Sequence, residues 1–259
     1  MIAPNRFSLM IVKNRYFKWL TFVFIFFALL SLIYFLSMPD VSKLKKENPK
    51  DTALMEYRMK EWKKKGKKLW VDQRWVPISR ISPYLIKAVL IAEDDKFWGH
   101  EGFDYEAIQK AIKRDIQAKR FKFGGSTISQ QLARNLYLSP QKSLLRKIAE
   151  AMITWRMEQV LSKRRILELY LNVVEWGEGI FGVEAASIHY YGKPSSWLDP
   201  QEAARLAAIL PNPRRYNPIE NQRYVVNRSN LIYSIMIERG IVVPEFKEVV
   251  EESESALER

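Results

Sequence analysis

Glu93 lies where a carboxyl group could act as a general base. It follows the apolar run YLIKAVLIA, so we expect it at the carboxyl end of a buried helix. Burial and the negative end of the helix dipole both disfavour the ionised form and would raise its pKa. A raised pKa suits proton transfer near neutral pH. Because Glu93 opens a run of three acids, a solvated helix end is the simpler explanation of this segment taken alone.

Glu150 lies beside two cations. Arg146 and Lys147 precede it by four and three residues, so a helix places all three side chains on one face. Next to these charges we expect Glu150 to remain ionised. Two carboxyl groups in different environments are typical of enzymes that act on sugars. A surface ion pair on an amphipathic helix is the more common explanation of these residues alone.

The segment GGSTISQQLARN, residues 124–135, combines a glycine pair with hydroxyl, amide and cationic side chains. Flexible glycines before a helix can present backbone N–H groups to an anion, with help from Ser and Thr hydroxyls. A loop with an ordinary Ser or Thr cap explains the segment equally well.

Composition narrows the chemistry that these residues can support. The 259 residues carry a formal charge of +13, which favours a polyanionic partner such as nucleic acid, anionic lipid or a phosphate-bearing substrate. The absence of cysteine excludes disulfides, thiolate metal sites and cysteine nucleophiles, and two histidines make a multi-histidine zinc site improbable. We therefore predict no metal-binding residues.

An uncharged stretch runs from Trp19 to Leu36, and extension to Met38 gives the length that a membrane-spanning helix needs. Pro39 ends it, and no small-residue cleavage site follows. We expect a retained single-pass anchor. Lysines and arginines are nearly balanced on its two sides, so charge does not decide the orientation.

The remainder is predicted to be an all-α domain. Ser82 and Pro83 form a helix start, and Asp199 with Glu202 forms a capping box. Further helices are expected over 143–161 and 163–172, and no alternating strand pattern is evident. The predicted organisation is a short cytoplasmic tail (1–18), a transmembrane helix (19–38), a basic juxtamembrane linker (39–78), the folded domain (79–240) and an acidic tail (241–259).

Taken in chain order, these sequence segments resemble the peptidoglycan glycosyltransferase family, specifically its monofunctional, single-pass members. The resemblance covers roughly residues 75–218. It is carried by the blocks AEDDKFWGHEGFD, GGSTISQQLARN, RKIAE, ILELYLNVVEWGEGIFGVEAAS with HYYGKP, and LAAILPNPRRYNP. One block could arise by chance, but chance does not explain all of them in this order.

The resemblance implies a two-lobed, lysozyme-like, all-α fold and lipid II as substrate. Glu93 would deprotonate the 4-hydroxyl of the acceptor GlcNAc, with inversion at the anomeric carbon and release of undecaprenyl diphosphate. Glu150 would help to stabilise the departing diphosphate, with Mg²⁺ or Mn²⁺ as a candidate cofactor. Arg134 departs from the lysine usual in the family, which keeps the charge but changes its geometry.

By motif position, the candidate substrate-binding residues are Asp94, Phe97, His100, Gly125, Ser126, Thr127, Gln130, Gln131, Arg134, Asn135, Arg146 and Lys147. The resemblance also implies a location in the bacterial cytoplasmic (inner) membrane, with the catalytic domain on the outer face. The implied partners are lipid II, the nascent glycan strand and membrane lipids. Cell-wall synthesis or division proteins are further candidates, and nucleic acid is not expected.

Two other functions remain as alternatives. A membrane-bound muramidase or lytic transglycosylase can share a lysozyme-like core, but the cations around Glu150 would be superfluous for an uncharged leaving group. A non-enzymatic module that holds lipid or nucleic acid predicts that Glu93→Gln leaves function intact.

Overall fold

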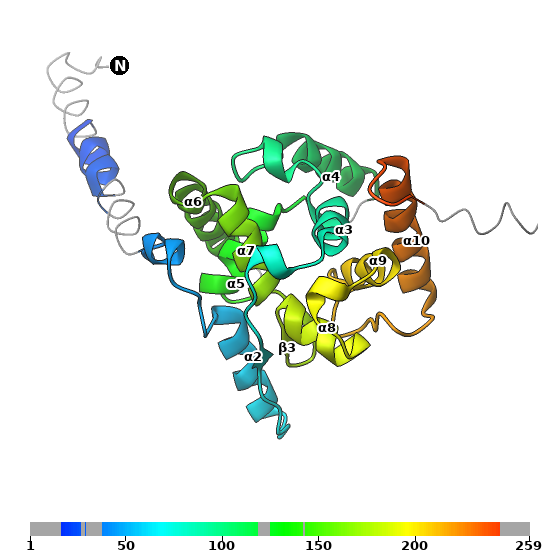
Figure 1. The fold of residues 1–259 in the computed structure, drawn as a ribbon. Coiled ribbons are helices and arrows are strands. Elements are labelled where there is room, and N and C mark those ends of the chain that lie inside the picture. The colour runs from blue at the N-terminus through cyan, green and yellow to red at the C-terminus, as the bar shows by residue number, and fades with distance from the viewer. Residues whose placement is uncertain (1–16, 27–28, 30–37, 119–124, 142, 244–259) are drawn as a thin grey trace, which may run out of the picture. The chain divides into compact units, whose positions relative to one another are not determined.

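The computed structural model describes residues 17–26, 29, 38–118, 125–141 and 143–243 (Figure 1). The chain divides into two compact units, Met1–Asp40 and Val41–Arg259. In the first unit residues 17–26 are helical. Among the described residues, no helix combines the length and the apolar character that crossing a bilayer requires. Part of the predicted span 19–38 lies outside the described residues, as does the acidic tail from 244 onward.

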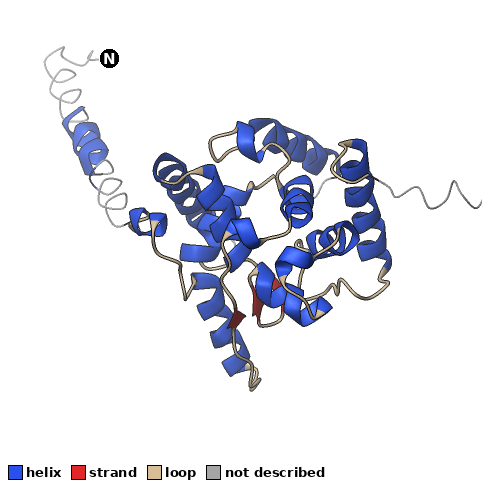
Figure 2. Cartoon of the chain, in the orientation of Figure 1, coloured by secondary structure: helices blue, strands red, loops and turns tan. Residues whose placement is uncertain are grey.

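The second unit is predominantly helical, which confirms the predicted class in its main feature (Figure 2). Its α-helices are α2 (Ala53–Lys64), α3 (Pro83–Glu93), α4 (Tyr105–Ala118), α5 (Ile128–Tyr137), α6 (Leu144–Val160), α7 (Lys163–Val173), α8 (Val183–Tyr191), α9 (Pro200–Ile209) and α10 (Arg223–Glu238). Its short 3₁₀ helices are η1 (Ser42–Lys45), η2 (Ile78–Arg80), η3 (Phe97–Gly99) and η4 (Ser195–Trp197).

A small sheet corrects the prediction that the domain has no strands. Its strands are β1 (Asp72–Gln73), β2 (Glu175–Gly177) and β3 (Ile180–Phe181), in the order β1-β3-β2. β1 is parallel to β3, and β2 is antiparallel to it. Strands of two or three residues are too short to show alternation in a sequence. The turn between β2 and β3 requires Gly179, whose φ is +84° and whose missing Cβ would lie 3.0 Å from the Trp70 carbonyl oxygen.

Helix α3 is the buried support that the candidate base requires. It packs against α9 and α10, and Leu85, Ala88 and Val89 on it are fully buried. It ends at Glu93, as predicted. Ser82 occupies the N-cap position, but its hydroxyl donates to the carbonyl of Leu198 instead of accepting from the helix.

A second group of helices lies around α5, which packs against α2, α6 and α7 (Figure 1). The capping box predicted for α9 is present: Asp199 Oδ1 accepts from the backbone of Gln201 and Glu202 at 2.9 Å. These two groups of helices carry the candidate site.

The expected linker was 39–78, before a domain that begins at 79, but residues 41–78 belong to the folded unit. Thr52 caps α2, accepting from the backbone of Met55 at 3.2 Å. Met55 and Trp62 are each 1% exposed and form a small apolar cluster with Phe181. The many lysines of this segment obscure a narrow apolar stripe on α2, which is why it resembled a solvated linker.

Candidate active site

Glu93 is held at the end of α3 in a protected position. Its side chain is 12% exposed. Gln131 Nε2, on α5, donates to Glu93 Oε2 at 2.8 Å, and Arg228 Nη2, on α10, lies 3.7 Å from Oε1. Burial raises the pKa of Glu93, while the Gln131 hydrogen bond and the nearby arginines oppose this shift. The structure therefore supports the expectation of a raised pKa.

Gln131 is itself oriented by Tyr170 of α7. The Tyr170 hydroxyl donates to Gln131 Oε1 at 3.2 Å, so the amide nitrogen of Gln131 faces Glu93. Tyr170 is completely buried. The sequence pattern did not indicate a role for Tyr170 or Arg228. Tyr170 resembled one more apolar residue of its helix, and Arg228 lies outside the segments that were recognised.

Glu150 is completely buried on α6 and forms ion pairs with Arg146 and Lys147, as the helical spacing predicted. Lys147 Nζ also donates to the Ser126 hydroxyl at 3.2 Å. Glu150 thus holds two cations in place, and one of them reaches the segment that precedes α5.

The carboxylate of Asp94 accepts a hydrogen bond from the amino terminus of α5. The backbone N–H of Ile128 donates to Asp94 Oδ2 at 2.9 Å, and Asp94 Oδ1 bonds His100 Nε2 at the same distance. Thr127 and Gln130 form a capping box. The N–H groups that the sequence suggested for a substrate anion already have internal partners at Ile128 and Gln130. Asp94, His100, Thr127 and Gln130 therefore hold α5 next to Glu93.

Three further candidates have packing contacts. Phe97 is buried, with Lys163 Nζ 4.7 Å from its ring centroid. Gly125 lies against α4, where an added Cβ would be 3.3 Å from the backbone of Ala107. Asn135 is 5% exposed. Gly124 lies outside the described residues.

Gln131 bonds a residue that lines one pocket and itself lines another. The first, here the Glu93 pocket, has a volume of about 210 Å³ and includes Glu93, Asp95, Asp104 and Ser126. The second, the Arg134 pocket, has a volume of about 240 Å³ and is lined by residues that include Gln131, Arg134, Asn135, Arg146, Arg58 and Glu175. Gln131 bonds the base of the first pocket and lines the second, so it connects the two.

Arg134 differs from the cations around it. Arg146 is paired with Glu150, and Arg58 with Glu175. Within the part of the chain that the structure describes, the Arg134 guanidinium makes no hydrogen bond or ion pair. Its charge is available to an anion that enters the pocket.

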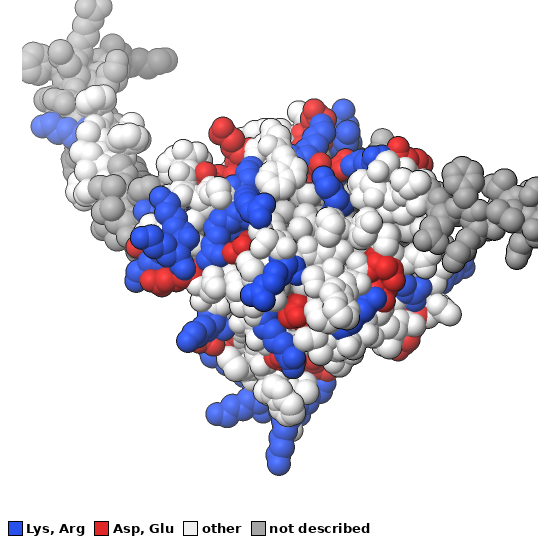
Figure 3. All heavy atoms as spheres, in the orientation of Figure 1, with Lys and Arg blue, Asp and Glu red and all other residues white. Residues whose placement is uncertain are grey.

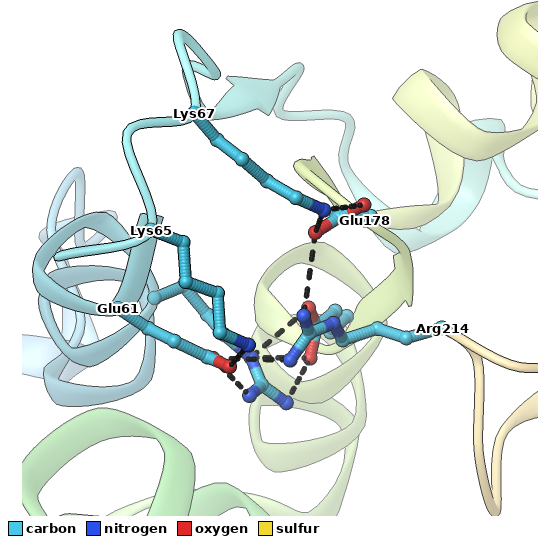
Figure 4. Close-up of polar contacts among 7 residues, drawn as sticks. Glu61, Lys65, Lys67, Glu178 and Arg214 are labelled. Carbon is cyan, nitrogen blue, oxygen red and sulfur yellow. Dashed lines mark hydrogen bonds and ion pairs between the residues drawn. The ribbon is translucent and has the colours of Figure 1, made fainter. Parts of the chain in front are cut away.

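The wall of the Arg134 pocket is braced by α2. Arg58 bonds both carboxylate oxygens of Glu175, at 3.0 Å (Nε to Oε2) and 3.1 Å (Nε to Oε1). Burial raises the pKa of Glu175, and the bonds from Arg58 oppose that shift. Figure 4 shows how the network continues: Glu61 forms ion pairs with Lys65 and Arg214, and Glu178 forms ion pairs with Lys67 and Arg214. Hydrogen bonding to Lys65, with help from the arginines, lowers the pKa of Glu61 to about 2.

On the face that Figure 3 shows, the positive charge is not gathered in one band. On the face in Figure 3, Lys and Arg side chains form several patches with carboxylates between them. The functional cations are therefore identified by the pockets that they line.

Comparison with known proteins agrees with this geometry. The family model described as Transglycosylase matches residues 61–237, which include every candidate residue named above. The chain belongs to the transglycosylase family. This confirms the resemblance seen in the motifs and identifies the chain as an enzyme of the glycosyltransferase class.

Relatives of this transglycosylase span most of its length. A protein of Nitrosospira multiformis, named biosynthetic peptidoglycan transglycosylase, is 44% identical over 225 residues, which cover 86% of this chain and 98% of the relative. Proteins of the same name from Dechloromonas aromatica and Azoarcus sp. are each 52% identical, over 170 and 190 residues. These alignments cover 66% and 73% of this chain, and 74% and 82% of the two relatives, respectively.

Glu150 offers no free carboxylate oxygen to a resident divalent cation. In the described ranges, no three His, Asp or Glu side chains form a group that could hold a metal ion. Both oxygens of Glu150 already bond cationic side chains. Mg²⁺ prefers carboxylate oxygens that are free to coordinate it. We therefore derive no step of the reaction through a metal.

Proposed function

We propose that this transglycosylase polymerises the glycan strands of peptidoglycan from lipid II, in the synthesis of the bacterial cell wall. One observation carries the proposal. Gln131 bonds the largely buried carboxylate of Glu93 and also lines the pocket of Arg134, which has no ion pair among the described residues. A base and a free cation thus both lie next to one residue, which suits transfer of a sugar from a diphosphate to a hydroxyl.

Glu93 is the general base in this proposal. As the 4-hydroxyl oxygen of the acceptor GlcNAc attacks the anomeric carbon of the donor, its proton passes to the Glu93 carboxylate. The bond from that carbon to the diphosphate breaks, and its electron pair leaves with undecaprenyl diphosphate. Attack opposite the leaving group inverts the anomeric carbon. The raised pKa of Glu93 brings its proton affinity closer to neutral pH, where general-base catalysis is more effective.

Arg134, Arg146 and Lys147 stabilise the diphosphate as its charge grows. Arg134 is available because it has no ion pair among the described residues, and its planar guanidinium can contact two phosphate oxygens. Glu150 acts through its neighbours, because its carboxylate holds Arg146 and Lys147. Ser126 and Lys147, which bond each other, provide a polar contact beside the Glu93 pocket.

The lipid-linked substrate suits an enzyme attached to a membrane. We propose that residues 19–38 anchor the chain in the cytoplasmic membrane in a single pass, with the second unit on the outer face. The support is the uncharged stretch from Trp19 to Leu36. We also propose a two-lobed, lysozyme-like arrangement, with membrane lipids and cell-wall synthesis or division proteins as partners.

Incubation of the full-length, detergent-purified protein with labelled lipid II tests this function. We expect polymer that muramidase digests back to disaccharide units. If the protein makes no polymer but shortens preformed glycan strands, it is a hydrolase or lytic enzyme and the proposal is wrong. If it does neither yet binds lipid, the non-enzymatic alternative replaces it.

A further inference from the structure

A third pocket lies beside the Glu93 pocket and has no role in the reaction described above. It has a volume of about 450 Å³, and its lining includes Asp95, Trp98, Gly99, Asp104, Tyr105 and Glu106. We call it the Trp98 pocket. Asp95 and Asp104 line both this pocket and the Glu93 pocket, so the two share a wall. The two pockets therefore adjoin.

Two large aromatic side chains are exposed in this pocket. Trp98 is 54% exposed and Tyr105 is 73% exposed. Each ring has an aromatic neighbour: Trp98 meets buried Phe97 edge to face, with centroids 5.1 Å apart, and Tyr105 lies 6.4 Å from the ring of Phe103. Large exposed aromatic side chains whose rings pack against a neighbouring ring are typical of binding surfaces.

The charges of the pocket indicate an uncharged ligand. Its lining carries the carboxylates of Asp95, Asp104 and Glu106 but only one lysine, Lys96, in a chain whose formal charge is +13. Lys96 Nζ is paired with Glu106 at 2.6 Å. Asp95 is likewise paired, with Arg239 at the end of α10, so the pocket has no unpaired cation among these groups to attract a diphosphate or an anionic lipid headgroup. Carboxylates accept hydrogen bonds from hydroxyl and amide N–H groups, and aromatic rings pack against the apolar faces of sugars.

We propose that the Trp98 pocket binds an N-acetylated sugar unit of the growing glycan strand, beyond the unit that reacts at Glu93. This inference rests on the proposed function. Lipid II contributes a single disaccharide, so the growing strand is the substrate long enough to occupy both pockets. Such a contact would hold the strand between successive additions and lengthen the product.

Gly99 offers a way to block the pocket without disturbing the fold. A Cβ added at Gly99 would meet no atom within 4 Å, and the residue is not among the glycines with positive φ. Gly99→Leu therefore adds a large side chain at the lining of the pocket without a clash at Cβ. Trp98→Ala and Tyr105→Ala remove the aromatic surface instead. Trp197, which is 71% exposed on η4, provides the matched control Trp197→Ala.

The test measures binding of chitotetraose, an uncharged oligomer of GlcNAc, to the full-length protein in detergent by isothermal titration calorimetry. We expect Trp98→Ala, Tyr105→Ala and Gly99→Leu each to weaken binding by about tenfold, as expected for loss of one stacking contact. Trp197→Ala should bind like the wild type. Failure of the wild type to bind, or equal affinity in all variants, would overturn the inference. Melting temperatures confirm that each variant is folded.

A second measurement is the length of the glycan made from labelled lipid II. Variants of the Trp98 pocket should make shorter strands while they join the first two substrates at the wild-type rate. Unchanged strand length would overturn the proposed role. If the wild type binds chitotetraose but makes no polymer, the polymerase function fails and the sugar site stands.

Contact with a membrane surface is the competing explanation for exposed aromatic side chains at this pocket. The full-length protein in nanodiscs containing brominated lipid distinguishes the two, because bromine quenches tryptophan in contact with it. We expect the same quenching in the wild type and in Trp98→Phe. Quenching that disappears in Trp98→Phe would place this ring in lipid and overturn the sugar site.

Discussion

Gln131 Nε2 donates a hydrogen bond to Glu93 Oε2 at 2.8 Å, while Gln131 Oε1 accepts from the Tyr170 hydroxyl at 3.2 Å. The second bond orients the amide that makes the first. Donation to the carboxylate favours its ionised form and partly offsets the effect of burial. Gln131 and Tyr170 are therefore positioning residues, and together they adjust the proton affinity of the base.

Replacement of Gln131 should change the pH dependence of the reaction. In Gln131→Leu the bond that lowers the Glu93 pKa is lost, so this pKa rises further above its ordinary value. The base is then protonated at a higher pH, and the acidic limb of the kcat/KM profile moves upward. Gln201→Leu, at an exposed position on α9, is the control. An acidic limb that stays at the wild-type pH in Gln131→Leu would contradict the role of this bond.

Glu93 should also make the fold less stable as pH rises. Its pKa in the folded state is raised, so the folded state holds its proton more tightly than the unfolded chain does. The stability from this proton is fully present below the unfolded pKa of about 4.3 and is lost as pH rises through the folded pKa. Glu93→Gln cannot titrate, so its free energy of unfolding relative to the wild type should increase with pH. Denaturant unfolding over a pH series measures this, and a constant difference would contradict it.

Arg134 should contribute to activity much more than to stability. Its guanidinium has no ion pair or hydrogen bond among the described residues, so Arg134→Ala should change the free energy of unfolding by less than about 0.5 kcal/mol. Loss of a charge that contacts the diphosphate should lower kcat/KM by at least about tenfold, or about 1.4 kcal/mol. Arg134→Lys keeps the charge and should recover most of the activity. A fully active Arg134→Ala enzyme would remove this residue from the site.

Arg58, in contrast to Arg134, should contribute mainly to stability. Its partner Glu175 has a side chain that is only 5% exposed, so Arg58→Ala leaves a buried carboxylate without its cation. Loss of one partner of a buried ion pair costs about 3 kcal/mol. Lys65→Ala, which removes the more exposed partner of Glu61, should cost less than about 1 kcal/mol. Equal melting temperatures for Arg58→Ala and Lys65→Ala would show that α2 does not brace the pocket.

Local patterns predicted the parts of the fold that depend on neighbouring residues. The end of α3 at Glu93, the capping box at Asp199 and the cation pairs of Glu150 all follow from spacings within one helix. Glu168 of α7 pairs with Arg165, three residues before it, through a similar spacing.

Contacts between distant segments were not predictable in the same way. The bonds from Ile128 to Asp94 and from Tyr170 to Gln131 join residues that are far apart in sequence. The hydroxyl of Ser82 bonds Leu198 because tertiary packing brings that carbonyl close. The role of α2 was missed because its lysines dominate the composition, whereas the buried faces of Met55 and Trp62 become evident only when Phe181 packs against them.

The rate of glycan bond formation in Glu93→Gln is the most direct test of the proposed mechanism. The wild type and the variant are mixed in full-length form with labelled lipid II, and the first coupling step is followed under single-turnover conditions. The amide of glutamine keeps the size of the side chain but cannot accept the proton, so the rate should fall by about 10²- to 10⁴-fold. Coupling at close to the wild-type rate in a folded Glu93→Gln enzyme would contradict the assignment of Glu93 as the base.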